Sequence, residues 1–247
     1  MANSVKRRYK VLIGIGIAFV LGIIGVYIAV RASIHPPTAA AERASQSARV
    51  TDDYYYYPSR QTDTPMVVFY PGALVEPASY SLWAKKVAAA GYPVYVLKVP
   101  LDMALLAQNK GDSVVGRNQR AYVVGGHSLG GVIAARYAQK HLASSRLRGA
   151  FFLAGYPDKK GDLRHADLPV LSVSATWDVV LNMTAYKKAK QYLPATADYR
   201  VITGGNHAGF GSYTGQAGDK KAAISNAQQQ QEITDLLVGW LKKLPQK

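Results

Sequence analysis

The sequence predicts an α/β fold: a mainly parallel sheet with helices on both faces, preceded by one transmembrane helix. Strand-like and helix-like segments alternate along most of the chain, which is the pattern of a parallel sheet with crossover helices. A sharp strand–serine–helix corner lies near the middle, and an uncharged apolar run lies near the N-terminus. The stretch between Leu153 and Pro169 is too short for a large inserted lid domain.

Composition fits one large domain with an appendage. The chain has 247 residues, of which 49% are hydrophobic and 18% are charged, enough for a sizeable core. It contains no cysteine, which excludes disulfides, a thiol nucleophile and a lipid-modified N-terminal cysteine. The net charge is +15, but the basic residues beyond the apolar run are scattered and form no nucleic-acid-binding module. We therefore predict no nucleic-acid partner, and read the charge as suited to an anionic membrane or wall polymer.

The N-terminal segment has the features of a membrane anchor. Residues 11–30 carry no charge and have the length needed to cross a bilayer, about 20 residues. The basic tail at 1–10 precedes them and only Arg31 follows closely, so the positive-inside rule places the tail in the cytoplasm and the rest of the chain outside. A cleaved signal peptide is the alternative, but its apolar region is normally shorter and the site after Arg31-Ala32 is poor. We predict an uncleaved, single-pass anchor in the cell membrane.

Residues 31–53 are predicted to be a stalk, because they are rich in Ala, Ser, Arg and Gln and have Pro36-Pro37 near their start. Residues 39–48 have partly helical composition. The tyrosine run Tyr54–Tyr57 favours an edge strand that opens the globular domain, 54–247. A carbohydrate-stacking patch is the other interpretation of this run.

Apolar runs in the domain predict the strands of the sheet, and segments of helical period predict the helices. The strands are Met66–Tyr70, Val94–Val99, Ala121–Gly125, Gly149–Ala154, Pro169–Ser174 and Tyr199–Thr203. The helices are Ser79–Ala90 (stopped by Gly91), one within Leu101–Val115, one from Val132 after the serine corner, and Asn226–Lys243, with Ile233, Leu236, Leu237 and Trp240 on one face.

The corner Gly126-His127-Ser128-Leu129-Gly130 has the G-x-S-x-G pattern of a nucleophile elbow. A strand leads into it and a helix leaves it, so the Ser128 hydroxyl is expected at the carboxyl end of the sheet. The start of that helix favours developing negative charge. The alternative is a glycine-rich turn that happens to hold a serine.

A serine hydroxyl needs a base, and the base needs a carboxylate that orients it. His207 follows the last strand between glycines, whereas the side chain of His127 is expected to point away from the position of the base. Asp178 follows the strand before that of the histidine, so the order Ser, Asp, His is that of an elbow-type hydrolase. The alternative role of Asp178 is a helix N-cap before Val179.

Acyl transfer also needs donors for the oxyanion. The backbone N–H of Leu129, after the candidate nucleophile, is one candidate. The backbone N–H of Ala73, in the loop after an early strand, is the other, and it is chosen on position alone.

These stretches resemble the α/β-hydrolases, and most closely the compact bacterial group called the alpha/beta hydrolase fold-5 family. The resemblance implies Ser128, Asp178 and His207 as a catalytic triad, and Glu76 as a glutamate of the oxyanion loop that contacts substrate or holds the loop. Ala73 replaces a usual glycine, and Trp177 replaces a smaller residue before the acid, which is expected to narrow the pocket. The matching stretches are Phe69–Gly72, Val75-Glu76, Gly91-Tyr92, Gly125–Gly131, Ala154–Pro157 and Gly204–Tyr213.

The sequence thus predicts a membrane-anchored, extracytoplasmic serine esterase that forms an acyl-enzyme. Its substrate is expected to be a small-molecule or lipid-like carboxylic ester, with no cofactor and no metal. The alternatives are a non-catalytic surface-exposed binding protein on the same fold and an acyltransferase. The sequence indicates neither the substrate nor the oligomeric state.

Overall fold

The computed structural model describes residues 2–245, with the backbone alone for 2–11 and 14, and it separates into two units at Ile34/His35. The first unit is the helix α1 (Ala2–Ala32). Its stretch Ile15–Ala32 has a mean hydropathy of 2.2 and none of it is buried, so α1 is long and apolar enough to span a membrane. A signal sequence would meet the same criteria.

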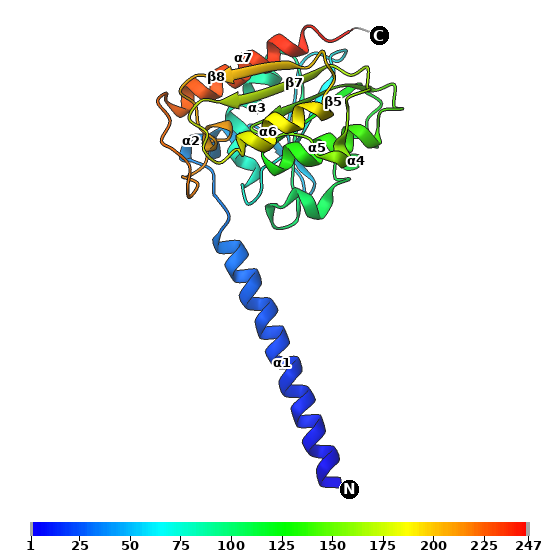
Figure 1. Cartoon of the computed structure of the whole chain (residues 1–247), viewed down its shortest axis with the longest axis vertical. Coiled ribbons are helices and arrows are strands. Elements are labelled where there is room, and N and C mark those ends of the chain that lie inside the picture. The colour runs from blue at the N-terminus through cyan, green and yellow to red at the C-terminus, as the bar shows by residue number, and fades with distance from the viewer. Residues whose placement is uncertain (1, 246–247) are drawn as a thin grey trace. The chain divides into compact units, whose positions relative to one another are not determined.

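The second unit contains one eight-stranded sheet among the described residues, in the order β1-β2-β4-β3-β5-β6-β7-β8 (Figure 1). β1 and β2 are antiparallel to their neighbours, and the remaining pairs are parallel. This confirms the predicted fold class. The strands are β1 (Arg49–Val50), β2 (Tyr54–Tyr57), β3 (Met66–Tyr70), β4 (Val94–Leu97), β5 (Tyr122–His127), β6 (Leu147–Leu153), β7 (Val170–Ala175) and β8 (Asp198–Ile202).

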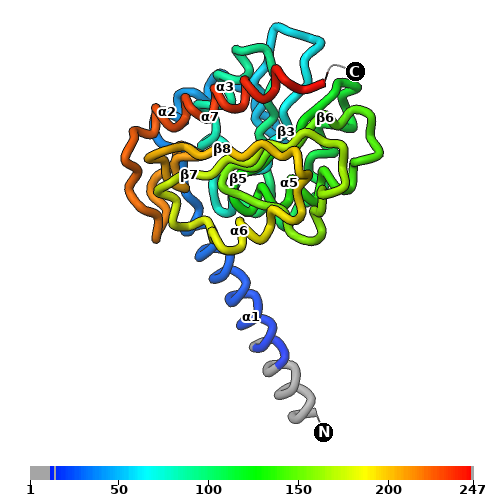
Figure 2. The backbone as a smooth tube through the Cα atoms, turned by 45° about the horizontal axis from the view of Figure 1, so that its top comes forward, coloured from blue at the N-terminus to red at the C-terminus, as the bar shows by residue number. Residues whose placement is uncertain are grey.

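Helices cover both faces of this sheet, each over its own buried core. Trp83 of α3 and Ile233 and Trp240 of α7 belong to one core, on the face that also carries α2. Ile133 of α5 and Val114 of α4 belong to the other, and α6 joins this face through Tyr186, whose hydroxyl lies 2.9 Å from that of Ser172. Figure 2 shows α2, α3 and α7 together. The helices are α2 (Ala39–Ser45), α3 (Ser81–Ala89), α4 (Asp112–Val115), α5 (Leu129–Lys140), α6 (Met183–Ala189) and α7 (Asn226–Leu241).

The predicted stalk differs from what the structure shows. From His35 onward the chain belongs to the globular unit: α2 packs on α3, and β1 pairs with β2 outside the tyrosine strand. The tyrosine run is therefore next to the edge rather than at it. Its alternate side chains pack on Tyr95, with ring centroids 5.0 Å away for Tyr54 and 4.4 Å for Tyr56. The small side chains of Ala41 and Ala44 allow α2 to lie close to the core.

The predicted helix within 101–115 is also different. Two 3₁₀ turns, η2 (Pro100–Asp102) and η3 (Ala104–Ala107), precede the single turn of α4. Leu101 and Asp102 have positive φ values of 53° and 50°, which an α-helix cannot accommodate.

Candidate active site

Ser128 lies at a strained corner between β5 and α5. Its φ of 52° and ψ of −122° are outside the ordinary regions for a residue with a side chain. The backbone holds this conformation, because the Ser128 N–H donates to the carbonyl of Leu153 at 3.0 Å and its carbonyl accepts from the Gly131 N–H at 2.9 Å. This is the strand–turn–helix geometry of a nucleophile elbow.

The glycines on either side of Ser128 are required by close backbone contacts. A Cβ on Gly126 would overlap the backbone of Gly130. A Cβ on Gly130 would overlap the carbonyl oxygens of Tyr70 and Pro71, in the segment that follows β3. The corner is therefore packed directly against the loop that carries Ala73.

His207 and Asp178 form a buried pair. The Nδ1 atom of His207 lies 2.8 Å from Oδ2 of Asp178, and the side chains are 2% and 0% exposed. Since an ionised carboxylate only accepts hydrogen bonds, Nδ1 carries the proton and donates it, which leaves Nε2 as the acceptor. The other oxygen of Asp178 accepts from the N–H groups of Val180 and Leu181, at 3.0 and 2.8 Å. The carboxylate thus both caps a turn and orients the imidazole.

Ser128 and His207 line the same pocket, of about 230 Å³. Leu129 lines it too, so the structure brings together three of the residues that the sequence singles out. Most of the remaining lining is apolar and comes from Val132, Ala154, Val180 and Leu181, with Tyr156 and Asn182 also present. Such a pocket accommodates a small apolar group beside the serine hydroxyl.

The N–H groups of Ala73 and Leu129 have no hydrogen-bond partner among the described residues. Their neighbours in the loop are paired: the Leu74 N–H donates to the carbonyl of Asp102 at 2.8 Å, and the Gly72 N–H donates to the Tyr80 hydroxyl at 2.8 Å. The two unpaired donors lie on the two segments that Gly130 packs together, and of the two residues only Leu129 lines the pocket.

Glu76 and Trp177 are not among the residues that line this pocket. Glu76 is half-buried, and its N–H donates to the carbonyl of His35 at 3.2 Å. Trp177 is 37% exposed, and Nζ of Lys220 lies 3.9 Å from its ring centroid. The expected narrowing of the pocket by Trp177 is not seen, because the indole lies under the lysine instead.

The structure places the side chain of His127 next to those of His207 and Tyr80, contacts that the sequence does not predict. Its side chain is buried, and its ring centroid lies 4.6 Å from that of His207. Its Nδ1 atom lies 3.0 Å from the hydroxyl of Tyr80. The sequence gives no signal for Tyr80, which is 47 residues from its histidine partner.

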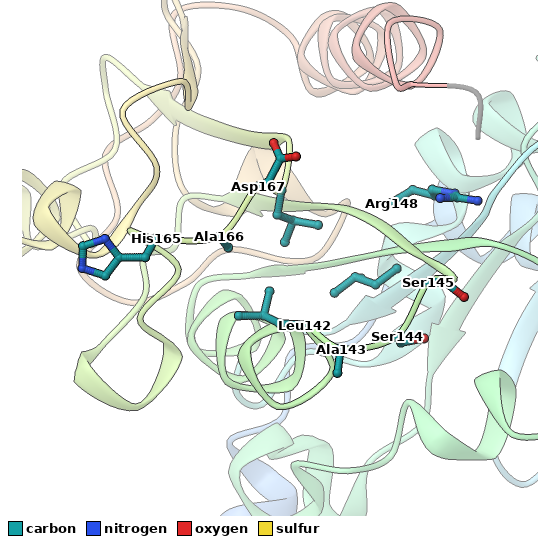
Figure 3. A pocket seen from close by; sticks show the side chains of 10 residues that line it. Leu142, Ala143, Ser144, Ser145, Arg148, His165, Ala166 and Asp167 are labelled. Atoms are coloured by element: carbon teal, nitrogen blue, oxygen red, sulfur yellow. The ribbon is translucent and has the colours of Figure 1, made fainter.

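A larger pocket, of about 390 Å³, lies at the opposite edge of the sheet. Its lining residues lie just before β6 and β7 or at the start of β6, whereas Ser128, Asp178 and His207 follow their strands. Figure 3 shows the side-chain nitrogens of Arg148 and His165 pointing away from one another. Because no acid, base and nucleophile converge there, the smaller pocket is the better candidate.

Known proteins share this architecture. The sequence pattern of the Alpha/beta hydrolase family matches residues 66–231. No curated protein matches the chain. Among solved structures, a dienelactone hydrolase from Anabaena variabilis has a TM-score of 0.58 and 14% identity, over 78% of this chain and 92% of its own. MGS-MChE2, an alpha/beta hydrolase from the metagenome of lagoon sediments at Mar Chica, Morocco, has 0.59 and 17%, over 79% and 98%. A monoacylglycerol lipase from Paleococcus ferrophilus has 0.59 and 14%, over 76% and 99%. At such identities the likeness concerns the fold.

Proposed function

The chain belongs to the alpha/beta hydrolase family, and on this premise we propose that it is a serine hydrolase that cleaves carboxylic esters. Ser128 is the proposed nucleophile, His207 the base and Asp178 the carboxylate that orients the base. One observation carries the proposal: the buried Asp178–His207 pair, at 2.8 Å, shares a pocket with a serine at a strained corner. A structural histidine–aspartate pair would not need a strained serine beside it.

The reaction follows from the proton positions in the site. Nε2 of His207 takes the proton of the Ser128 hydroxyl as its oxygen attacks the ester carbonyl. The imidazolium then returns the proton to the leaving alcohol, which leaves an acyl-enzyme. Water, deprotonated by the same nitrogen, attacks the acyl group, and Nε2 then gives that proton to the Ser128 oxygen as the bond to the acyl group breaks and the acid is released.

The oxyanion that forms during each attack requires donors already in place. The N–H groups of Ala73 and Leu129 supply them, and the N-terminus of α5 adds a favourable dipole. These donors are backbone groups, so they hold the oxyanion whichever side chains stand at the two positions.

Ester hydrolysis tests the proposal directly. The full chain, in detergent, is assayed with p-nitrophenyl esters of increasing acyl length. Ser128→Ala is expected to lower kcat by about 10⁴–10⁶-fold. The control is Ser145→Ala, an exposed serine at the opposite edge, which is expected to keep full activity. Equal turnover by wild type and Ser128→Ala would contradict the proposal. Short acyl chains are expected to be favoured, because the apolar pocket is only about 230 Å³.

We further propose that α1 anchors the protein as a single-pass membrane helix, with residues 1–10 in the cytoplasm and the globular unit outside. The length and hydropathy of α1 and the basic tail before it support this topology. Because the chain has no cysteine, a single introduced cysteine is the only residue of the protein that a thiol reagent labels. A membrane-impermeant maleimide on intact cells is expected to label Ala143→Cys and not Ser4→Cys. Labelling of the second variant alone would reverse the topology.

A further inference from the structure

A buried hydrogen-bond chain joins the candidate nucleophile corner to the loop that carries Ala73. The Tyr80 hydroxyl accepts from the Gly72 N–H at 2.8 Å and lies 3.0 Å from Nδ1 of His127. Tyr80 is fully buried and His127 is 1% exposed. His127 is the residue directly before Ser128, and Gly72 is the residue directly before Ala73. One end of this hydrogen-bond chain is therefore next to the proposed nucleophile Ser128, and the other end is next to the proposed oxyanion donor Ala73.

The pKa directions of the two side chains limit which of their atoms can carry a proton. Burial raises the pKa of the Tyr80 hydroxyl above its ordinary value, so the hydroxyl keeps its proton. Burial, together with the neighbouring His207, holds the pKa of His127 well below its ordinary value, so this imidazole is neutral. Tyr80 accepts from Gly72, and we infer that it gives its own proton to Nδ1 of His127. In this arrangement the proton of His127 is on Nε2, a buried atom with no hydrogen-bond partner among the described residues.

The groups of this hydrogen-bond chain are closely packed. A Cβ on Gly72 would come within 2.7 Å of Nδ1 of His127 and 3.2 Å of the Tyr80 oxygen. On its other side, the His127 ring lies 4.6 Å from the ring of His207, centroid to centroid. His127 thus contacts both the base and the support of the oxyanion loop.

We propose that Tyr80 and His127 are positioning residues for the oxyanion site: the hydrogen bonds from Gly72 to Tyr80 and from Tyr80 to His127 fix the Gly72–Ala73 peptide, so that the Ala73 N–H faces the acyl oxygen. This inference rests on the proposed function. Neither side chain touches the substrate. Both act through the backbone of the loop, and His127 couples that backbone to the serine corner.

The test compares three variants of the full chain in detergent. Tyr80→Phe removes the hydroxyl, and His127→Leu removes its acceptor. In His127→Asn the carboxamide oxygen takes the place of Nδ1 and accepts from Tyr80. Loss of one oxyanion donor lowers kcat by about 10²–10³-fold, and a displaced donor is expected to cost about 10–100-fold. We expect this fall in kcat for Tyr80→Phe and His127→Leu, a KM within about two-fold of wild type, and recovery of most of kcat in His127→Asn.

A transition-state analogue separates positioning from general damage. A trifluoromethyl ketone forms a tetrahedral adduct with a serine, and its oxygen occupies the oxyanion site. In Tyr80→Phe and His127→Leu, the inhibition constant of this ketone is expected to rise by the same factor by which kcat falls. The double variant is expected to lose no more than either single variant, because both remove one shared hydrogen bond.

Tyr57→Phe is the matched control. Tyr57 is equally buried, and its hydroxyl donates to Oγ of Ser81 at 2.6 Å rather than to Gly72 or His127. It is expected to lose stability like any buried tyrosine that gives up a hydrogen bond, but to keep its kcat and its inhibition constant.

The outcomes distinguish this inference from the function on which it rests. An inactive wild type would defeat the proposed function. An active wild type whose Tyr80→Phe and His127→Leu variants behave like Tyr57→Phe would overturn the positioning pair alone. If those variants do not fold, ring ¹H–¹⁵N spectra of the wild type decide, with His127→Asn used for assignment. We expect the neutral tautomer of His127 with its proton on Nε2, and a proton on Nδ1 would overturn the inference.

Discussion

The two carboxylate oxygens of Asp178 have different partners. Oδ2 accepts from Nδ1 of His207, and Oδ1 accepts from the N–H groups of Val180 and Leu181. The proposed catalytic role and the N-cap alternative therefore coexist in one side chain. Substitutions can separate them, because asparagine keeps an acceptor oxygen but has no negative charge.

Asp178→Asn is expected to lower kcat by about 10³–10⁴-fold, since a neutral amide no longer fixes the tautomer of His207 in which Nε2 accepts. The turn at Val180 and Leu181 keeps its acceptor, so the unfolding temperature is expected to change little. Steady-state kinetics and a thermal melt measure the two effects. Wild-type kcat in a folded Asp178→Asn protein would exclude this carboxylate from the mechanism.

Asp178→Ala is the contrasting variant, because it removes both oxygens. It is expected to lose the same activity and, in addition, about 1–3 kcal/mol of unfolding free energy, because one buried and one partly buried N–H group are left without a partner. Urea unfolding measures this. Equal stability of the alanine and asparagine variants would contradict the proposed cap.

At the residue scale, the sequence predicts where a residue lies in the sheet better than it predicts which side chains that residue contacts. Ser128, Asp178 and His207 each follow a strand of the sheet, and this order is visible in the apolar runs. The role of His127 is not visible, because it depends on Tyr80, whose place is set by the turn η1 (Pro77–Tyr80) and not by any local pattern. Long-range polar contacts of this kind leave no periodic signal.

At the element scale, an ion pair links α5 to the turn η4 (Lys159–Gly161) that follows β6. Nε of Arg136 lies 3.1 Å from Oδ2 of Asp158, whose other oxygen accepts from the N–H groups of Lys160 and Gly161. Burial acts to raise the pKa of Asp158, but Arg136 and these N–H groups outweigh it and hold the pKa below its ordinary value.

A lowered carboxyl pKa stabilises the folded state above the unfolded pKa, and this stability is lost as the pH falls through the folded value. Asp158→Asn is therefore expected to unfold more easily than wild type at pH 7, by about 0.5–1 kcal/mol for a partly exposed pair. The difference is expected to shrink once the pH falls below the ordinary carboxyl pKa, about 3.9, and to vanish only at low pH, below the lowered pKa of the folded wild type, where its carboxyl is protonated too. Urea unfolding at the two pH values measures this, with exposed Asp52→Asn as control. A difference that persists at low pH would contradict the ion pair as its source.

Residues 35–38, soon after α1, form a strap that joins two loops of the globular unit. Four backbone hydrogen bonds tie it down: two join His35 to Leu74 and Glu76, and two join Pro36 and Thr38 to the stretch 212–214 that follows His207. The Thr38 hydroxyl also lies 2.7 Å from that of Ser212. The strap therefore holds the loop of Ala73 and the histidine loop at once.

Removal of the strap is expected to affect stability and activity together. A chain that begins at Thr51 loses the four hydrogen bonds, each contributing about 0.5–1.5 kcal/mol, as well as the packing of α2. Compared with a chain that begins at His35, it is expected to be about 2–6 kcal/mol less stable and to have a lower kcat. Equal melting temperatures and rates for the two chains would show that the strap contributes nothing.

At the element scale, a sequence pattern with the period of a strand or a helix predicts that element well when the element is regular. The strands and α3, α5 and α7 follow from apolar runs and helical spacing. The strap and the 101–115 segment do not, because their conformations depend on partners far along the chain. Leu101 and Asp102 have positive φ, and the Asp102 carbonyl accepts from Leu74. The local sequence therefore predicts a stalk at 31–53 and a helix within 101–115, and both predictions differ from the structure.

At the scale of the whole molecule, the chain consists of an apolar helix and a globular unit that begins at His35. All the candidate site residues belong to the second unit. A chain beginning at His35 is thus expected to be soluble and to match the kcat of the full chain, whereas the full chain is expected in the membrane fraction. Fractionation and an ester assay on each fraction measure this. Retention of the shortened chain in the membrane would show that a second surface binds lipid.

The central claim is that Ser128, activated by His207 and Asp178, is the nucleophile. The most direct measurement is mass spectrometry of the protein after reaction with a fluorophosphonate, which phosphonylates an activated serine. We predict one adduct, on Ser128, with labelling greatly slowed in His207→Ala and absent in Ser128→Ala. An adduct on another serine, or none on the folded protein, would contradict the account.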